Sequence, residues 1–112
     1  MKRRCSKEFM EQFQNISLKG VDFEPQKSNL EKYGRPETGV YELVREPDNS
    51  HDPNAIGVFF LKHRIGYIDR DQAPKLSPLM DKGIEFYAEY EHLNTCDWEP
   101  GVGITVSIFE VF

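Results

Sequence analysis

Two segments of this 112-residue chain carry apolar residues at helical spacing. In residues 6–15, Ser6 is placed to cap a short amphipathic helix. In residues 71–82, Pro74 fits the first turn and Gly83 ends the helix. We expect one stripe of each helix to face a hydrophobic core. The two stripes are Phe9, Met10 and Phe13, and Ala73, Leu76, Leu79 and Met80.

Other segments alternate between apolar and polar residues, which is typical of strands with one buried face. Residues 16–23 alternate weakly and are predicted to form the first strand. Ser28 to Glu31 is a capping-box pattern, which predicts a helical turn after that strand. The alternation changes phase near Ile108, which predicts a β-bulge there. The remaining strands are predicted over residues 40–45, 56–61, 65–68, 84–91 and 102–111.

These elements predict a mainly β fold, a curved OB-like or SH3-like β-barrel of about six strands with two short helices. No linker, repeat or low-complexity tract divides the sequence. We therefore expect residues 1–112 to form a single domain, in which residues 1–15 are an N-terminal helical extension. A chain of this length can bury a modest core without disulfides. Cys5 and Cys96 are expected to stay reduced.

The charge balance limits the partners of this chain. It contains 14 Lys and Arg residues against 19 Asp and Glu residues, a net charge of -5. Sequence-independent affinity for nucleic acids comes from neutralising phosphates, so this balance argues against a general polyanion binder. Because only one basic residue follows position 80, any nucleic acid must avoid the C-terminal third. No stretch is apolar over a membrane-spanning length, and we expect a soluble, cytoplasmic protein without a membrane partner.

A segment rich in Asp, Asn and Pro separates the strands predicted over residues 40–45 and 56–61. Such residues favour tight, preformed turns, because proline fixes φ and Asx side chains bond nearby backbone. We expect Asp52 and Asn54 to accept hydrogen bonds from backbone amides inside this loop. The sequence therefore predicts a rigid loop between two strands.

The same loop offers candidate ligand-binding groups. His51 has a flat ring that can stack on a base or sugar, and Asn49 and Asp52 supply acceptor oxygens. Tyr67 and Arg70 lie nearby if the strand that contains Tyr67 runs beside the loop. A carboxylate is a poor phosphate ligand but a good partner for a sugar hydroxyl. The combination suits a strand end or a nucleoside, unless the polar side chains only satisfy the turn.

The loop and the strand predicted over residues 65–68 resemble the signature of the HIRAN domain family. The matching segments read LVREPDNSHDPNAI at residues 43–56 and RIGYI at residues 64–68. The resemblance implies a small β-barrel related in shape to OB-folds, which is fused to helicase-like ATPases or stands alone in bacteria and phages. It also implies recognition of single-stranded DNA by its free 3′ end, in DNA repair or at replication forks.

The resemblance implies a role for each candidate residue. In members that hold a 3′ end, His51 corresponds to an aromatic ring that stacks and Asp52 to an Asp that binds the terminal hydroxyl. Asn49 corresponds to an Asn beside them. Tyr67 stands where the family has a His or Tyr near phosphate, and Arg70 matches a basic position shortly after it.

Two positions depart from the DNA-binding members. Asp22-Phe23 stands where their first strand carries an Arg-Tyr pair that grips phosphate, so we expect DNA affinity to be modest. The second aromatic platform is expected at Trp98 or Tyr87. The departures and the negative charge leave an alternative open, namely a protein-interaction or architectural module that keeps the HIRAN fold without strong DNA binding.

Other chemistry finds little support in the sequence. The cysteines and histidines lack the paired spacing of zinc ligands, and no Gly-rich phosphate loop is present. We therefore expect no metal, no cofactor and no enzymatic activity. The expected partners are a single-stranded DNA end and a protein such as a helicase-like ATPase.

Overall fold

The structure is a computed structural model that describes residues 5–33, 40–96 and 99–111, without the side chains of residues 93–102. Within these residues, six antiparallel strands form one curled half-barrel sheet in the order β1-β6-β5-β2-β3-β4. The predicted mainly β, barrel-like fold is therefore confirmed. The strands are β1 (Ile16–Ser17), β2 (Val40–Arg45), β3 (Ile56–Phe60), β4 (His63–Tyr67), β5 (Phe86–Cys96) and β6 (Glu99–Glu110).

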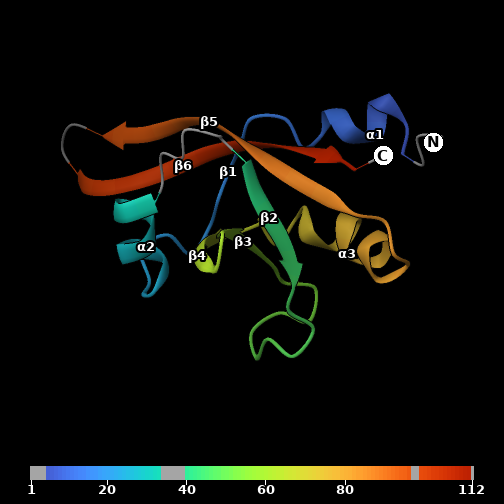
Figure 1. Cartoon of the computed structure of the whole chain (residues 1–112), viewed down its shortest axis with the longest axis horizontal. Helices are drawn as coiled ribbons and strands as arrows, with labels where there is room; N and C mark the ends of the chain where they lie inside the picture. The colour runs from blue at the N-terminus through green and yellow to red at the C-terminus, as the bar shows by residue number, and fades with distance from the viewer. Residues whose placement is uncertain (1–4, 34–39, 97–98, 112) are drawn as a thin grey trace.

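The long β5–β6 hairpin crosses the molecule, and β2, β3 and β4 continue the sheet from it (Figure 1). β2 pairs with β5 from Val40–Glu89 to Glu42–Tyr87, which covers only the first part of β5. The β2–β3 loop projects from the lower end of the sheet in Figure 1. The sheet therefore presents this loop away from the hairpin.

The sheet curls until its two edge strands almost meet. Lys19, just after β1, forms an antiparallel bridge with Tyr67 of β4, and its amide donates to the Tyr67 carbonyl at 2.8 Å. The close approach requires a glycine at position 66, where a Cβ atom would lie 3.0 Å from the Leu18 Cβ. This closure brings the segment after β1 beside β4.

Three helices are present among the described residues, α1 (Lys7–Glu11), α2 (Gln26–Tyr33) and α3 (Ala73–Asp81). The predicted cap of α1 is confirmed, since the Ser6 hydroxyl accepts from the amide of Phe9 at 3.1 Å. Pro74 lies in the first turn of α3 as predicted. Gly83, with φ of +97°, follows α3 in a conformation that favours glycine.

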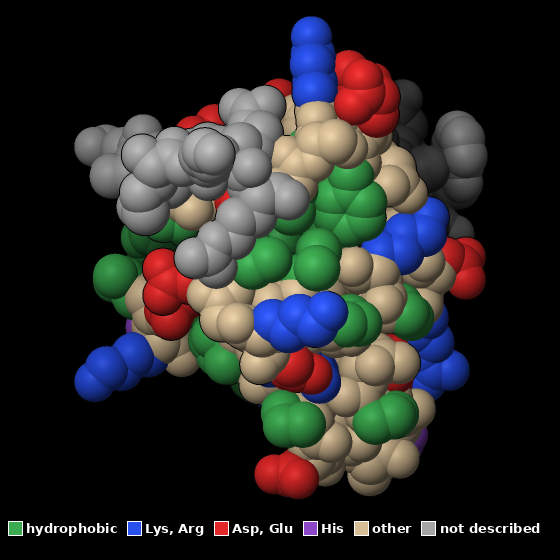
Figure 2. Space-filling view, turned by 90° about the vertical axis from the view of Figure 1, so that its right-hand side faces the viewer, with side chains coloured by type: hydrophobic (Ala, Val, Ile, Leu, Met, Phe, Trp, Pro, Cys, Tyr) green, Lys and Arg blue, Asp and Glu red, His purple; other side chains and the backbone are tan. Residues whose placement is uncertain are grey.

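The core lies inside the curl of the sheet. Of the two predicted stripes, Phe13, Ala73 and Leu76 are fully buried. The stripe residues nearer the surface, Leu79 and Met80 among them, are only partly buried against this core. Figure 2 views the side that carries α1 and α3 and shows hydrophobic side chains among charged ones. The largest fully buried apolar side chains elsewhere are Tyr41, Ile56, Ile65, Ile104 and Ile108.

Two predictions about the first third of the chain are wrong. The strand expected over residues 16–23 ends at Ser17; Lys19 then bridges to Tyr67 of β4, and Gly20, with φ of +72°, turns the backbone away from an extended path. The capping box expected at Ser28 lies inside α2, which begins two residues earlier. Glu24 caps the N-terminal turn of α2 instead, since its carboxylate accepts a hydrogen bond from the Ser28 amide at 2.8 Å.

The β-bulge expected near Ile108 is also misplaced. The register of the β5–β6 ladder shifts between Tyr90 and His92 instead. The phase change near Ile108 has another cause, because residues 104–108 of β6 are buried at every position. The segment before β1 lies against this part of β6, since the Ile108 amide donates to the Phe13 carbonyl at 2.9 Å and the Asn15 amide donates to the Ser107 hydroxyl at 2.9 Å.

Candidate nucleic-acid interface

The central loop is closed at its base by backbone hydrogen bonds. The Glu46 amide donates to the Ala55 carbonyl at 2.9 Å, and the Asn49 amide donates to the Glu46 carbonyl at 3.0 Å. Arg45 reinforces the base, since its Nη1 donates to the Ala55 carbonyl and its guanidinium pairs with Asp81 of α3. The loop is therefore fixed to both the sheet and a helix.

Asx turns set the conformation of the loop tip. The Asn49 Oδ1 accepts from the amides of His51 at 2.9 Å and Asp52 at 3.2 Å. The predicted backbone bond of Asp52 is confirmed, since its Oδ1 accepts from the Asn54 amide at 2.9 Å. The same prediction for Asn54 is wrong, because its Oδ1 accepts from the Ser77 hydroxyl of α3 at 3.1 Å.

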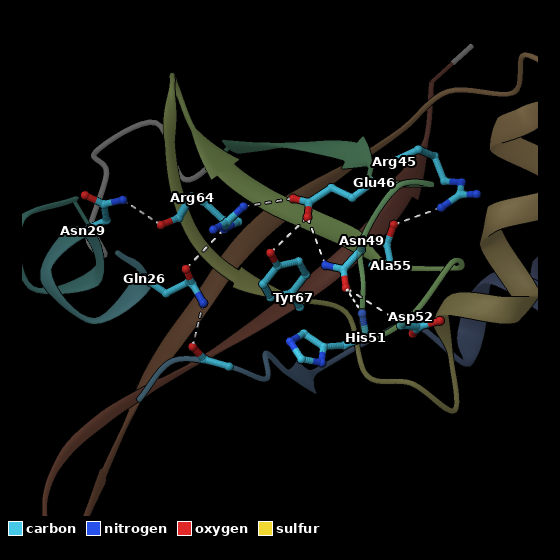
Figure 3. A network of polar contacts seen from close by, with 11 residues as sticks. Gln26, Asn29, Arg45, Glu46, Asn49, His51, Asp52, Ala55, Arg64 and Tyr67 are labelled. Atoms are coloured by element: carbon cyan, nitrogen blue, oxygen red, sulfur yellow. Dashed lines mark hydrogen bonds and ion pairs between the residues drawn. The ribbon is translucent and has the colours of Figure 1, made fainter. Parts of the chain in front are cut away.

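The Glu46 carboxylate connects the loop to β4 (Figure 3). Its Oε1 accepts from the Tyr67 hydroxyl at 3.0 Å and from the Asn49 Nδ2 at 3.3 Å. Its Oε2 accepts from the Arg64 Nη1 at 3.3 Å. A half-buried carboxylate with three side-chain donors is well satisfied, because two oxygens offer about four lone-pair sites.

Arg64 extends this network to α2. Its Nε donates to the Gln26 Oε1 at 3.2 Å, and the Gln26 Nε2 donates to the Gly20 carbonyl at 3.0 Å. The guanidinium carbon lies 5.1 Å from the centre of the Tyr67 ring, a cation–π distance. The network therefore joins four segments: the turn after β1, α2, the loop and β4.

The five predicted site residues lie on this one network. Asn49, His51 and Asp52 share the Asx turns, and Tyr67 is linked to Asn49 through the Glu46 carboxylate. Arg70 reaches the loop from beyond β4, since its Nη2 donates to the His51 carbonyl at 3.3 Å. The contact role predicted for each of them stays a prediction.

Tyr67 differs from what its expected position near phosphate requires. Its hydroxyl proton is donated to Glu46, so the oxygen can accept from a ligand but has no proton for a phosphate. Burial first, and then the hydrogen bond to Glu46, raises the pKa of the Tyr67 phenol.

The alkaline limit of stability should reflect the buried phenols. Burial raises the pKa of Tyr41 strongly, and burial with the Glu46 bond raises that of Tyr67. Unfolded tyrosines ionise near pH 10, so the unfolded state loses protons first. We expect the free energy of unfolding to be steady below about pH 10 and to fall as the pH rises further. Urea unfolding from pH 8 to 12 measures this, and an equal fall in Tyr41→Phe would contradict it.

The segment that departs from the DNA-binding pattern lies beside Tyr67. The Phe23 amide donates to the Gly20 carbonyl, and a Cβ atom on Gly20 would lie 3.2 Å from the Tyr67 ring. The Phe23 side chain is 71% exposed. Of the two expected second platforms, Trp98 lies outside the described residues, and Tyr87 stacks on Phe109 at 5.5 Å. Phe23 is therefore an exposed aromatic residue in the turn at Gly20, whose carbonyl belongs to the network.

Sequence reasoning overlooked Glu46 and Arg64. Glu46 stands in the segment 43–56 and Arg64 in the segment 64–68. Regular strand alternation, however, would place Arg64 and Tyr67 on opposite faces of the sheet. The β3–β4 register shift leaves Ile65 unpaired, because Gly66 pairs with Val58 and Arg64 with Phe59. This bulge turns both side chains to one face. The sequence signal that could have indicated this pair is Arg64, three residues before Tyr67, together with the acidic Glu46 at the start of the loop.

Two other kinds of site receive no support from the described residues. Among residues 5–33, 40–96 and 99–111, no group of three or more His, Cys, Asp or Glu side chains could hold a metal ion. No helix in this part of the chain is long and apolar enough to cross a membrane.

The fold and the loop define a small curled β domain with one preorganised polar loop site. A profile of the HIRAN domain matches residues 14–108, so the chain belongs to the HIRAN domain family, which is generally associated with single-stranded DNA binding. A crystal structure of a protein from Lactobacillus plantarum is similar, with a TM-score of 0.64 and 26% identity over 85% of this chain and 91% of that one. No curated protein matches the chain.

Proposed function

We propose that this domain binds the 3′ end of single-stranded DNA at the loop site, as a recognition module without catalytic activity. One observation carries the proposal: Arg70 donates to the carbonyl of His51, the residue that precedes Asp52. The Arg70 guanidinium, at an exposed residue, thus contacts the fixed turn at the residue directly before the one that carries the acceptor carboxylate. The carboxylate suits a terminal sugar hydroxyl, and the guanidinium suits the phosphate before it.

The hydrogen bonds inside the loop support recognition of an end. The Asp52 Oδ1 is bonded to the Asn54 amide, which orients the carboxylate and leaves Oδ2 outside that bond. The His51 side chain is exposed beside it and can stack on the terminal base or sugar. A continuous strand has no free 3′ hydroxyl to donate, so the proposed site prefers termini.

The surrounding charge supports modest affinity. Lys19 lies 3.7 Å from the Asp69 carboxylate, which offsets its attraction for phosphate. Asp22 adds an exposed negative charge in the turn beside Tyr67. Few phosphates are neutralised, and the salt dependence of binding should be correspondingly shallow.

Anisotropy titrations at two salt concentrations test the proposal, using 5′-labelled oligonucleotides with a 3′ hydroxyl or a 3′ phosphate. Asp52→Ala should lower the preference for the free hydroxyl by about tenfold, because a charge-assisted hydrogen bond is lost. Arg70→Ala should weaken both oligonucleotides equally and lower the salt slope by about one. Lys82→Ala, at an exposed residue after α3, is the matched control. Equal wild-type affinity for both oligonucleotides would refute end recognition.

Asp22→Arg should raise affinity for both oligonucleotides and steepen the salt dependence, because it replaces repulsion by attraction beside the site. Glu31→Arg makes the same charge change at an exposed residue of α2 and controls for net charge. The same titrations measure both variants. An equal gain in DNA affinity for Asp22→Arg and Glu31→Arg would show that the effect comes from net charge and not from the position of Asp22.

A protein-interaction module remains the second candidate function. Among the described residues, which omit 34–39, the ladder between β2 and β5 ends at Glu89, and β5 continues from Tyr90 to Cys96 beyond that pairing. An extended peptide from a partner such as a helicase-like ATPase can add to a strand edge of this kind. Undetectable DNA binding at low salt by wild type and by Asp22→Arg alike would favour this function.

A further inference from the structure

We propose that Glu46 is the positioning residue of the loop site, and that it sets selectivity for a 3′ end without touching the DNA. The proposal rests on the proposed function for its ligand. Glu46 acts through two residues: Asn49, which shapes the loop, and Tyr67, which lies on β4.

The contacts of Glu46 span the site. Its backbone closes the loop, with its amide donating to the Ala55 carbonyl and its carbonyl accepting from the Asn49 amide. Its carboxylate then accepts from the Asn49 Nδ2 and the Tyr67 hydroxyl. The Asn49 Oδ1 in turn accepts from the backbone amides of His51 and Asp52. A shift of the Glu46 side chain is therefore transmitted directly to the proposed ligand groups.

The fold makes a socket for this carboxylate. Gly57 of β3 pairs with Tyr67 of β4 and lies beneath Glu46. A Cβ atom at position 57 would lie 2.6 Å from the Glu46 Oε2 and 2.7 Å from a ring carbon of Phe59. A buried strand glycine weakens a sheet unless another group needs the space. Here the space is occupied by the Glu46 side chain.

The negative charge of Glu46 favours a positioning role over direct contact with DNA. A carboxylate close to a DNA backbone opposes binding, so Glu46 is a poor direct partner for phosphate. Arg64 pairs with it at 3.3 Å, and the two side chains are 28% and 19% exposed. The charge is thus neutralised within the protein. Removing Glu46 should leave the attraction for phosphate intact or stronger while loosening the end-binding geometry.

The test measures a selectivity ratio, the Kd for a 3′-phosphate oligonucleotide divided by the Kd for the 3′-hydroxyl form. Glu46→Ala should lower this ratio by about fivefold or more, because hydrogen bonds that orient the loop are lost. Affinity for the 3′-phosphate oligonucleotide should stay the same or rise. Glu42→Ala removes an exposed carboxylate from β2, the strand that ends directly before Glu46, and should leave the ratio unchanged. An unchanged ratio in a folded Glu46→Ala protein overturns the proposal.

Gly57→Ala perturbs the same carboxylate without removing any polar group, and it should lower the ratio in the same direction. Hydrogen exchange gives a second readout without DNA. The amides of His51 and Asp52 should exchange about tenfold faster in Glu46→Ala but not in Glu42→Ala. If wild type binds no DNA, the proposed function fails, and this exchange result alone decides the positioning role. Unchanged exchange would then overturn it.

Discussion

Leu76→Ala should lower the free energy of unfolding by about 2 to 5 kcal/mol, because it leaves a cavity in a fully buried part of the core. Leu76 lies in α3, whose buried face packs into the curl of the sheet. A domain of this size has a total stability of only about 5 to 15 kcal/mol. The variant should therefore unfold at much lower urea concentration, as followed by far-UV circular dichroism.

Leu79 in the same helix and Lys82 directly after it provide the comparison. Leu79 belongs to the same apolar stripe but is only partly buried, so Leu79→Ala should cost less than Leu76→Ala. Lys82→Ala, at an exposed position, should change stability by about 0.5 kcal/mol or less. Equal losses for Leu76→Ala and Leu79→Ala would contradict the packing of α3 described above.

The sequence predicted the elements whose burial is one-sided. β2 matches the predicted residues 40–45, and Leu76 was placed on the buried face of its helix. Prediction from the sequence failed where tertiary contacts override the local pattern of apolar and polar residues. Residues 18–23 alternate like a strand, yet the turn at Gly20 packs against Tyr67. Residues 104–108 are buried on both faces, which no alternation rule reveals.

The site was predictable where its contacts are local in sequence, and not where they depend on strand pairing. Asx chemistry acts over two or three residues, so the turns made by Asn49 and Asp52 follow from local sequence. The Arg64–Glu46 pair depends on a β-bulge at Ile65 and on the space above Gly57. Both are properties of strand pairing, and neither is visible in a single segment of sequence.

Asn49→Ala should lower the free energy of unfolding by about 1 to 3 kcal/mol and weaken 3′-end binding by about tenfold or more. The Asn49 side chain accepts from the amides of His51 and Asp52 and donates to Glu46, so alanine removes three bonds together. Urea unfolding and the anisotropy titration measure the two effects. A stable variant that binds normally would show that the loop holds its shape without these bonds.

Asn49→Asp separates the acceptor role of Asn49 from its donor role. Aspartate keeps an oxygen for the amides of His51 and Asp52, but it places a second carboxylate oxygen where Nδ2 lies 3.3 Å from the Glu46 Oε1. Two adjoining carboxylates raise the pKa of one of them in the folded state above its unfolded value. The resulting loss of stability is present at neutral pH and shrinks as the pH falls, because protonation removes the repulsion. We therefore expect the stability difference from wild type, measured in urea, to be smaller at pH 5 than at pH 7. A difference that is the same at both values would mean that the Asn49–Glu46 bond does not hold the loop to β4.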